Sequence, residues 1–193
     1  MKKIEVFKTE INYVKNEANR KDLKTLIKLL PDYFFEIPAA STGKYHPDFA
    51  QGEGGLVRHT KVAVRIAYEL LNNNTVGAKF TDQDKDLIIM ALVLHDGVKS
   101  GMEHSKYTKF DHPLLVSKLI MENKDKLSLE VDDIRKMCSM IESHMGEWTY
   151  DSYNQKEVLP KPRTAEQRFV HMCDFLASRK FLSVKFEDGT IVG

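Results

Sequence analysis

Histidine and aspartate side chains at the ends of predicted helices are the residues of this chain whose types could do chemistry. His95 and Asp96 follow the apolar stretch 87–94, and ionisable groups at the end of such a helix cost free energy unless they are paired or bind a metal. Asp174 lies on the apolar face of its own predicted helix and needs a partner for the same reason. A bound cation would satisfy both. The alternatives are a helix that simply meets solvent after His95, and an Asp174 that accepts hydrogen bonds from a neighbouring loop.

Three further histidines occupy the ends of other predicted helices. His59 lies early in its helix, His112 opens a helix and His144 closes one. Imidazole and carboxylate ligands suit divalent Mn, Fe, Co, Ni or Zn. Because the candidate ligands come from different helices, they would have to converge in the middle of a helical bundle. The spacings match neither a zinc finger nor the HExxH motif.

Helical periodicity dominates the elements that must position these residues. It predicts helices over 19–30, 56–71, 82–95, 112–124, 130–144 and 164–180. Segment 31–55 is a long loop whose many aromatic residues argue against disorder, so we expect it to be functional. The tail alternates around Asp188 and Gly189 and predicts a small β-hairpin. The sequence therefore predicts an all-α fold: one helical domain over 1–193 with a small C-terminal β-hairpin.

The charge balance restricts the classes of partner. Lys and Arg number 29 and Asp and Glu number 28, which gives a net charge of +1. This balance excludes a broad non-specific hold on long nucleic acid, although it leaves room for a local basic patch. Cys138 and Cys173 are expected to be buried thiols in a reducing compartment. The first residues contain no apolar stretch typical of a signal peptide, and no apolar run is long enough to span a membrane. We therefore expect a cytoplasmic protein without a membrane partner.

The order of the candidate ligands resembles that of the HD-domain metal-dependent phosphohydrolases, a helical superfamily. The shared order is His59, then the pair His95 and Asp96, then Asp174. The family's LLHDxxK motif is similar to VLHDGVK here, which places Lys99 three residues after Asp96. The resemblance covers about residues 30–180.

Two further segments extend the resemblance. His112 in FDHPLL and His144 in IESHMGEW fall where binuclear branches of the family place ligands for a second metal. The approach to the first histidine, IPAASTGKYHPDFAQGEGGLVRHT, is similar to that of bacterial HD-domain proteins related to a 3′-to-5′ exoribonuclease. Gly97 departs from the family, in which many members have isoleucine or leucine there, and we expect it to loosen the turn.

The resemblance implies a binuclear metal site. One divalent metal would be bound by His59, His95, Asp96 and Asp174, and Asp96 would bridge to a second metal held by His112 and His144. The ions would be Mn, Fe, Co, Ni or Zn, with Mg also acceptable. A shared water would then become a hydroxide near neutral pH and attack phosphorus. Lys99 is the expected catalytic contact to the phosphate, with an ordinary solvated lysine as the alternative.

The expected substrate-binding residues are Lys44, Tyr45, His46, Arg58 and Arg179. Lys44 and Arg58 would hold phosphate, and Tyr45 would stack on a base. His46 would protonate the leaving group. Arg179 would reach the rim of the pocket or pair with a surface acid. Each has a plainer alternative, since loop tyrosines and histidines are more often packed than catalytic.

Three functions follow from this interpretation. The first is a phosphohydrolase, either a phosphomonoesterase or a phosphodiesterase, that acts on a nucleotide or short oligonucleotide; the small, nearly neutral chain favours small substrates. The second is a single-strand 3′-to-5′ exonuclease, which a basic groove would support. The third is a non-catalytic nucleotide-binding HD module, which the complete ligand set argues against. Trp148 and Tyr150 are further candidates to line a base site.

Overall fold

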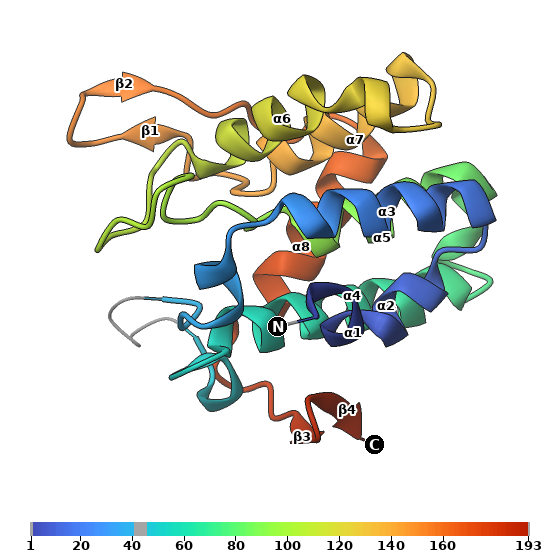
Figure 1. Cartoon of the computed structure of the whole chain (residues 1–193), viewed down its shortest axis with the longest axis horizontal. Coiled ribbons are helices and arrows are strands. Elements are labelled where there is room, and N and C mark those ends of the chain that lie inside the picture. Colours follow the sequence, from blue (N-terminus) through green and yellow to red (C-terminus); the bar gives the residue numbers. More distant parts are fainter. Residues whose placement is uncertain (1, 41–45, 193) are drawn as a thin grey trace.

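The computed structural model describes residues 2–40 and 46–192 and shows an all-α fold with two small antiparallel hairpins (Figure 1). The α-helices are α1 (Lys3–Val6), α2 (Lys8–Tyr13), α3 (Glu17–Leu29), α4 (Gly55–Asn72), α5 (Asp82–Leu94), α6 (His112–Glu122), α7 (Val131–Glu142) and α8 (Ala165–Ala177). The hairpins pair β1 (Tyr150–Asp151) with β2 (Lys156–Glu157) and β3 (Lys185–Glu187) with β4 (Thr190–Val192). The predicted fold class, including the C-terminal hairpin, is confirmed.

Local capping explains why helices α5 and α8 begin where they do. Thr81 and Asp84 form a reciprocal capping box at the start of α5, and Thr164 and Gln167 form another at the start of α8. Each box satisfies backbone N–H groups that the first turn leaves without intrahelical partners. Pro113 lies in the first turn of α6, where its missing N–H is harmless.

Helix α5 forms the centre of the molecule. Its apolar stretch 87–94 is buried on all sides, which explains why the run shows no polar face. Helices α2, α3, α4, α7 and α8 all contact it. In Figure 1, α6, α7 and the first hairpin lie on one side of α5, and α1, α2 and α4 lie on the other. Helix α8 packs against both α4 and α7 and so connects the two sides.

The N-terminal helices and the first hairpin were not predicted from the sequence. Helices α1 and α2 are too short to be stable alone, and tertiary packing of Phe7, Ile11 and Val14 holds them on the core. The long loop after α3 contains the 3₁₀ helices η1 (Asp32–Phe35) and η2 (Asp48–Ala50). Two further 3₁₀ helices, η3 (Gly77–Lys79) and η4 (Lys124–Lys126), lie in other connections. Among the described helices, none has the length and apolar character that crossing a membrane requires.

Candidate metal centre

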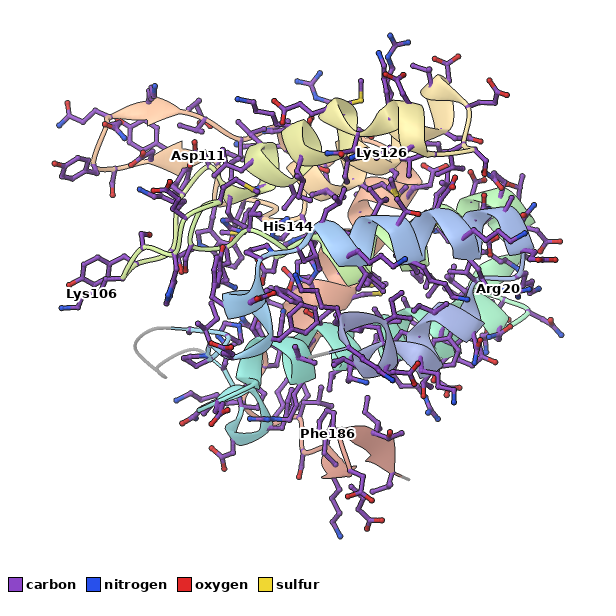
Figure 2. The ribbon with its side chains drawn as sticks, viewed as in Figure 1. Arg20, Lys106, Asp111, Lys126, His144 and Phe186 are labelled. Carbon is purple, nitrogen blue, oxygen red and sulfur yellow. The ribbon has the colours of Figure 1, made fainter. Side chains whose placement is uncertain are left out.

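The helix ends bring the six predicted ligands together inside the protein. They are His59 on α4, His95 and Asp96 after α5, His112 at the start of α6, His144 after α7 and Asp174 on α8. Five of them are buried, and Asp174 keeps 18% of its side chain exposed. Figure 2 shows His144 near the centre of the molecule. Residues far apart in the chain thus form one compact cluster, hereafter the His/Asp cluster.

One half of the cluster surrounds Asp174. His59 Nε2 lies 2.8 Å from Asp174 Oδ1, and His95 Nε2 lies 3.4 Å from the same oxygen. These three side chains form a group that could hold a metal ion. The arrangement requires α4, α5 and α8 to pack together, which they do along the core.

The other half surrounds Asp96. His112 Nε2 lies 2.9 Å from Asp96 Oδ1, and His144 Nε2 lies 3.8 Å from that oxygen. The second oxygen, Oδ2, lies 3.5 Å from His95 Nε2. His95, Asp96 and His144 form a second group that could hold a metal ion. Since His95 belongs to both groups, the two potential sites are adjacent.

The same local hydrogen bond orients three of the imidazole rings. In His95, His112 and His144, Nδ1 donates to a backbone carbonyl three residues earlier. The acceptors are Leu92, Lys109 and Ile141, at 2.7, 2.7 and 2.8 Å respectively. Because Nδ1 carries the proton, Nε2 of each neutral ring presents a lone pair to the cluster.

These lone pairs face carboxylate oxygens, so acceptors face acceptors. Among the described residues, His95 Nε2, Asp96 Oδ1 and His112 Nε2 are buried without a hydrogen-bond partner. The contact of His112 with Asp96 is short but does not have hydrogen-bond geometry. Buried acceptors without a donor cost free energy, and a cation between them would remove that cost. The residues present therefore fit a divalent metal.

The electrostatics of the cluster also favour a cation. Burial raises the pKa of Asp96, but Lys99, His95 and His112 outweigh it and hold that pKa well below its usual value. Burial opposes ionisation of Asp174 as well, but the hydrogen bond with His59 and the nearby His95 ring hold the pKa of Asp174 well below the usual range. Both carboxyl groups are therefore anionic at neutral pH.

Acidification is expected to destabilise the metal-free protein through His144. Burial, reinforced by the nearby His95, lowers the pKa of His144 from 6.5 to about 3. Below pH 6.5 the His144 side chain is protonated in the unfolded chain but stays neutral in the folded protein. Its contribution to the free energy of unfolding is therefore complete above pH 6.5 and is lost as the pH falls. We expect a loss of about 3 kcal/mol by pH 4 from this group.

Urea unfolding of the metal-free protein across this pH range measures the effect. His144→Gln should weaken the dependence of the free energy of unfolding on pH, whereas His104→Gln, outside the cluster, should leave that dependence unchanged. Asp96 and Asp174 add a further acid-side loss at lower pH, because their folded pKa values are depressed. The pKa of His95 is raised by Asp96 and Asp174 despite its burial, so it contributes the opposite slope. If the free energy of unfolding depended on pH in His144→Gln as it does in wild type, His144 would not be the source of the acid-side loss.

A cavity of about 450 Å³ opens beside the cluster, and five of the six cluster residues line it. Lys99 also lines it, with Nζ 2.6 Å from Asp96 Oδ2. The predicted phosphate contact through Lys99 stays a prediction. In this structure its ammonium group donates to the Asp96 carboxylate, at the centre of the second half of the cluster.

The predicted substrate-binding residues are distributed unevenly around this cavity. Arg179 and His46 line it, whereas Lys44 and Tyr45 lie outside the described residues. The His46 ring contacts His59 edge-on at 5.1 Å between centroids. Burial, reinforced by His59, lowers the pKa of His46 to about 3. Its ring is therefore neutral at pH 7 in this structure, and its expected role of protonating a leaving group stays a prediction.

Arg58 does not line the cavity. Its guanidinium donates to the carbonyl oxygens of Phe49, Gln51 and Glu53, so it holds the loop that leads into α4. The sequence indicated a charged residue beside His59, but its position on the helix directs the side chain towards the loop. In this structure Arg58 therefore supports the loop, and its expected contact with phosphate stays a prediction.

Gly97 is tightly packed, contrary to the expectation of a loosened turn. A Cβ atom at this position would lie 2.6 Å from Leu30 Cδ2 and 2.9 Å from the Leu94 carbonyl oxygen. Glycine is therefore required where the turn after α5 meets α3. The close approach fixes the position of Asp96 immediately before it.

Sequence reasoning left out His171, which lines the cavity. Its Nδ1 donates to the backbone carbonyl of His144 at 2.7 Å. Gly146 adopts a left-handed φ of +69°, and a Cβ there would lie 2.1 Å from His171 Cε1, so only glycine admits the ring. The available signal was its position three residues before Asp174, which places it near the same helix face.

Comparisons with known proteins do not identify the site. No family model, curated protein or solved structure matches this chain. What the site can do is therefore inferred from its own geometry: two adjacent groups of imidazole and carboxylate ligands, beside a cavity large enough for a small molecule.

Proposed function

We propose that the protein is a metal-dependent phosphohydrolase of the HD-domain type. The observation that carries the proposal is the set of buried imidazole nitrogens and carboxylate oxygens that face one another without donors. A first ion would be held by His59, His95, Asp96 and Asp174, and a second by Asp96, His112 and His144. Such ligands suit Mn, Fe, Co, Ni or Zn.

When bound, divalent ions supply a water-derived nucleophile at neutral pH and offset negative charge on the phosphoryl oxygens. The chain itself positions the ligands and the substrate. The backbone-bonded rings of His95, His112 and His144 keep their Nε2 atoms directed inward, and Lys99 orients the Asp96 carboxylate. This preorganisation avoids a reorganisation cost during the reaction.

A covalent mechanism through a cysteine finds no support. Both cysteines are buried. Burial raises the pKa of Cys138 to about 11 and also raises the pKa of Cys173. Neither thiol ionises near neutral pH, and the thiolate is the nucleophilic form.

The substrate we propose is a nucleotide with one phosphoester placed against the His/Asp cluster. The cavity of about 450 Å³ falls within the range of sites for single small ligands. Arg179 lies in its wall and supplies positive charge for a phosphorylated molecule. A nearly neutral chain favours a small substrate over a long strand.

A hydrolysis panel tests this function. Protein depleted of metal and reloaded with Mn²⁺ is offered nucleoside monophosphates, linear and cyclic dinucleotides, and a short labelled RNA. We expect turnover of at least one small nucleotide, abolished in His112→Asn and retained in His104→Asn, since His104 stacks on Tyr33 outside the cluster. Turnover of the RNA from its 3′ end alone would favour the exonuclease. No turnover of any compound by metal-loaded protein would refute the proposal.

A further inference from the structure

One wall of the cavity is built from two aromatic rings and a guanidinium group. The rings of Trp148 and Phe175 are nearly parallel, at 19°, with centroids 6.3 Å apart. The Arg179 Cζ atom lies 3.9 Å from the Phe175 ring centroid. All three side chains line the same cavity as the His/Asp cluster. We call these three residues the aromatic shelf.

The shelf is attached to the elements that carry the cluster. Phe175 directly follows Asp174 on α8. Trp148 comes four residues after His144, and its backbone N–H donates to the Met145 carbonyl. A group bound on the shelf would therefore be held close to the cluster.

Arg179 is fixed in place but its charge is not neutralised. Its Nε donates to the Phe175 carbonyl at 3.1 Å, and one Nη donates to Ser178 Oγ at 2.7 Å. Within the described part of the chain, no carboxylate forms an ion pair with this guanidinium. A planar cation held over a ring face extends a stacking surface.

Core packing does not account for Trp148. It is the single tryptophan of the chain, and 48% of it is exposed. An indole ring in the core would be mostly covered, with a partner for its N–H. An open aromatic face beside a positive charge is the kind of surface on which nucleobases stack.

We propose that the aromatic shelf binds the base of the nucleotide substrate, and that Trp148 and Phe175 set the requirement for a base. This inference rests on the proposed function, because the cluster is what places the phosphoester beside the shelf. Stacking of one base predicts that loss of Trp148 weakens nucleotide binding by about 5- to 150-fold. Ligands that lack a base should be unaffected.

Tryptophan fluorescence tests the shelf without any need for turnover. Nucleoside 5′-monophosphates carrying each of the four common bases, and ribose 5-phosphate as the baseless control, are titrated into Zn²⁺-loaded protein. Because the chain has one tryptophan, quenching reports directly on Trp148. We expect saturable quenching by at least one nucleotide and none by ribose 5-phosphate, with calorimetry showing tighter binding of the nucleotide.

Variants complete the test. Trp148→Ala should raise the nucleotide Kd by the stated factor, Trp148→Phe should restore most of the affinity, and neither should change the Kd of ribose 5-phosphate. Tyr153→Ala is the matched control, since Tyr153 is 93% exposed and does not line the cavity.

The outcomes separate the two proposals. Nucleotides that bind no tighter than ribose 5-phosphate, or that leave the fluorescence unchanged, overturn the shelf even when hydrolysis is observed. Quenching and tighter nucleotide binding without any hydrolysis support the shelf and count against the phosphohydrolase.

Discussion

Asp96→Asn should reduce the rate of phosphoester hydrolysis by at least about 10³-fold. Asp96 is the carboxylate at the centre of one half of the cluster. Its Oδ1 approaches His112 and His144, and its Oδ2 approaches His95 and Lys99. Asparagine keeps the shape but removes the negative charge that a bridging ligand supplies. Initial rates on the best substrate of the nucleotide panel, at saturating Mn²⁺, measure the loss.

The fold should survive this substitution. The asparagine amide could donate to the Nε2 lone pair of His112, which has no donor in the metal-free protein, so the variant should unfold no more easily than metal-free wild type. Asp125→Asn, at an exposed position on η4, is the matched control and should keep full activity. An active Asp96→Asn enzyme would remove Asp96 from the centre of the mechanism.

Removal of metal should lower the thermal stability of the wild-type protein by about 5–15 °C. An ion that binds only the folded state stabilises it by about 3–4 kcal/mol when present at 100 to 1,000 times its Kd. For a chain of this length each kcal/mol shifts Tm by about 2–4 °C. The structural reason is that metal satisfies the buried acceptors of His95, Asp96 and His112. Differential scanning calorimetry before and after chelation measures the shift.

The same comparison in a cluster variant controls for other effects of the chelator. His144→Gln removes a ligand, so chelation should change its Tm much less than it changes that of wild type. Readdition of Mn²⁺ should restore the wild-type value. A wild-type Tm that is indifferent to chelation and readdition would mean that the buried acceptors do not bind a cation.

The elements that position the cluster could be predicted because local chemistry determines them. Thr81 and Thr164 each begin a helix through a capping box, and the apolar run before His95 requires a central helix. An aspartate on an apolar helix face, Asp174, required a partner. His59 provides one at 2.8 Å. The full set of six ligands, with His112 and His144, was expected from the resemblance to HD-domain proteins, and the structure brings the six side chains together.

The side-chain roles that the sequence did not reveal depend on tertiary contacts. Arg58 bonds to loop carbonyls, which its place beside His59 in the sequence does not indicate. The contact of Lys99 with Asp96 joins residues three apart, and the spacing left open whether Lys99 would contact Asp96 or phosphate. The tight packing of Gly97 depends on Leu30, which lies at the C-terminal end of α3. His171 enters the cavity wall because Gly146 has no Cβ, a contact between segments that periodicity does not connect.

The most direct test of the central claim is the number of metal ions bound per chain. Metal-depleted protein is titrated with Mn²⁺, and bound metal is counted by plasma mass spectrometry after removal of free ions. We expect two ions per wild-type chain and a loss of metal in Asp96→Asn. One ion in wild type would contradict the bridging role of Asp96, and none would contradict the metal centre itself.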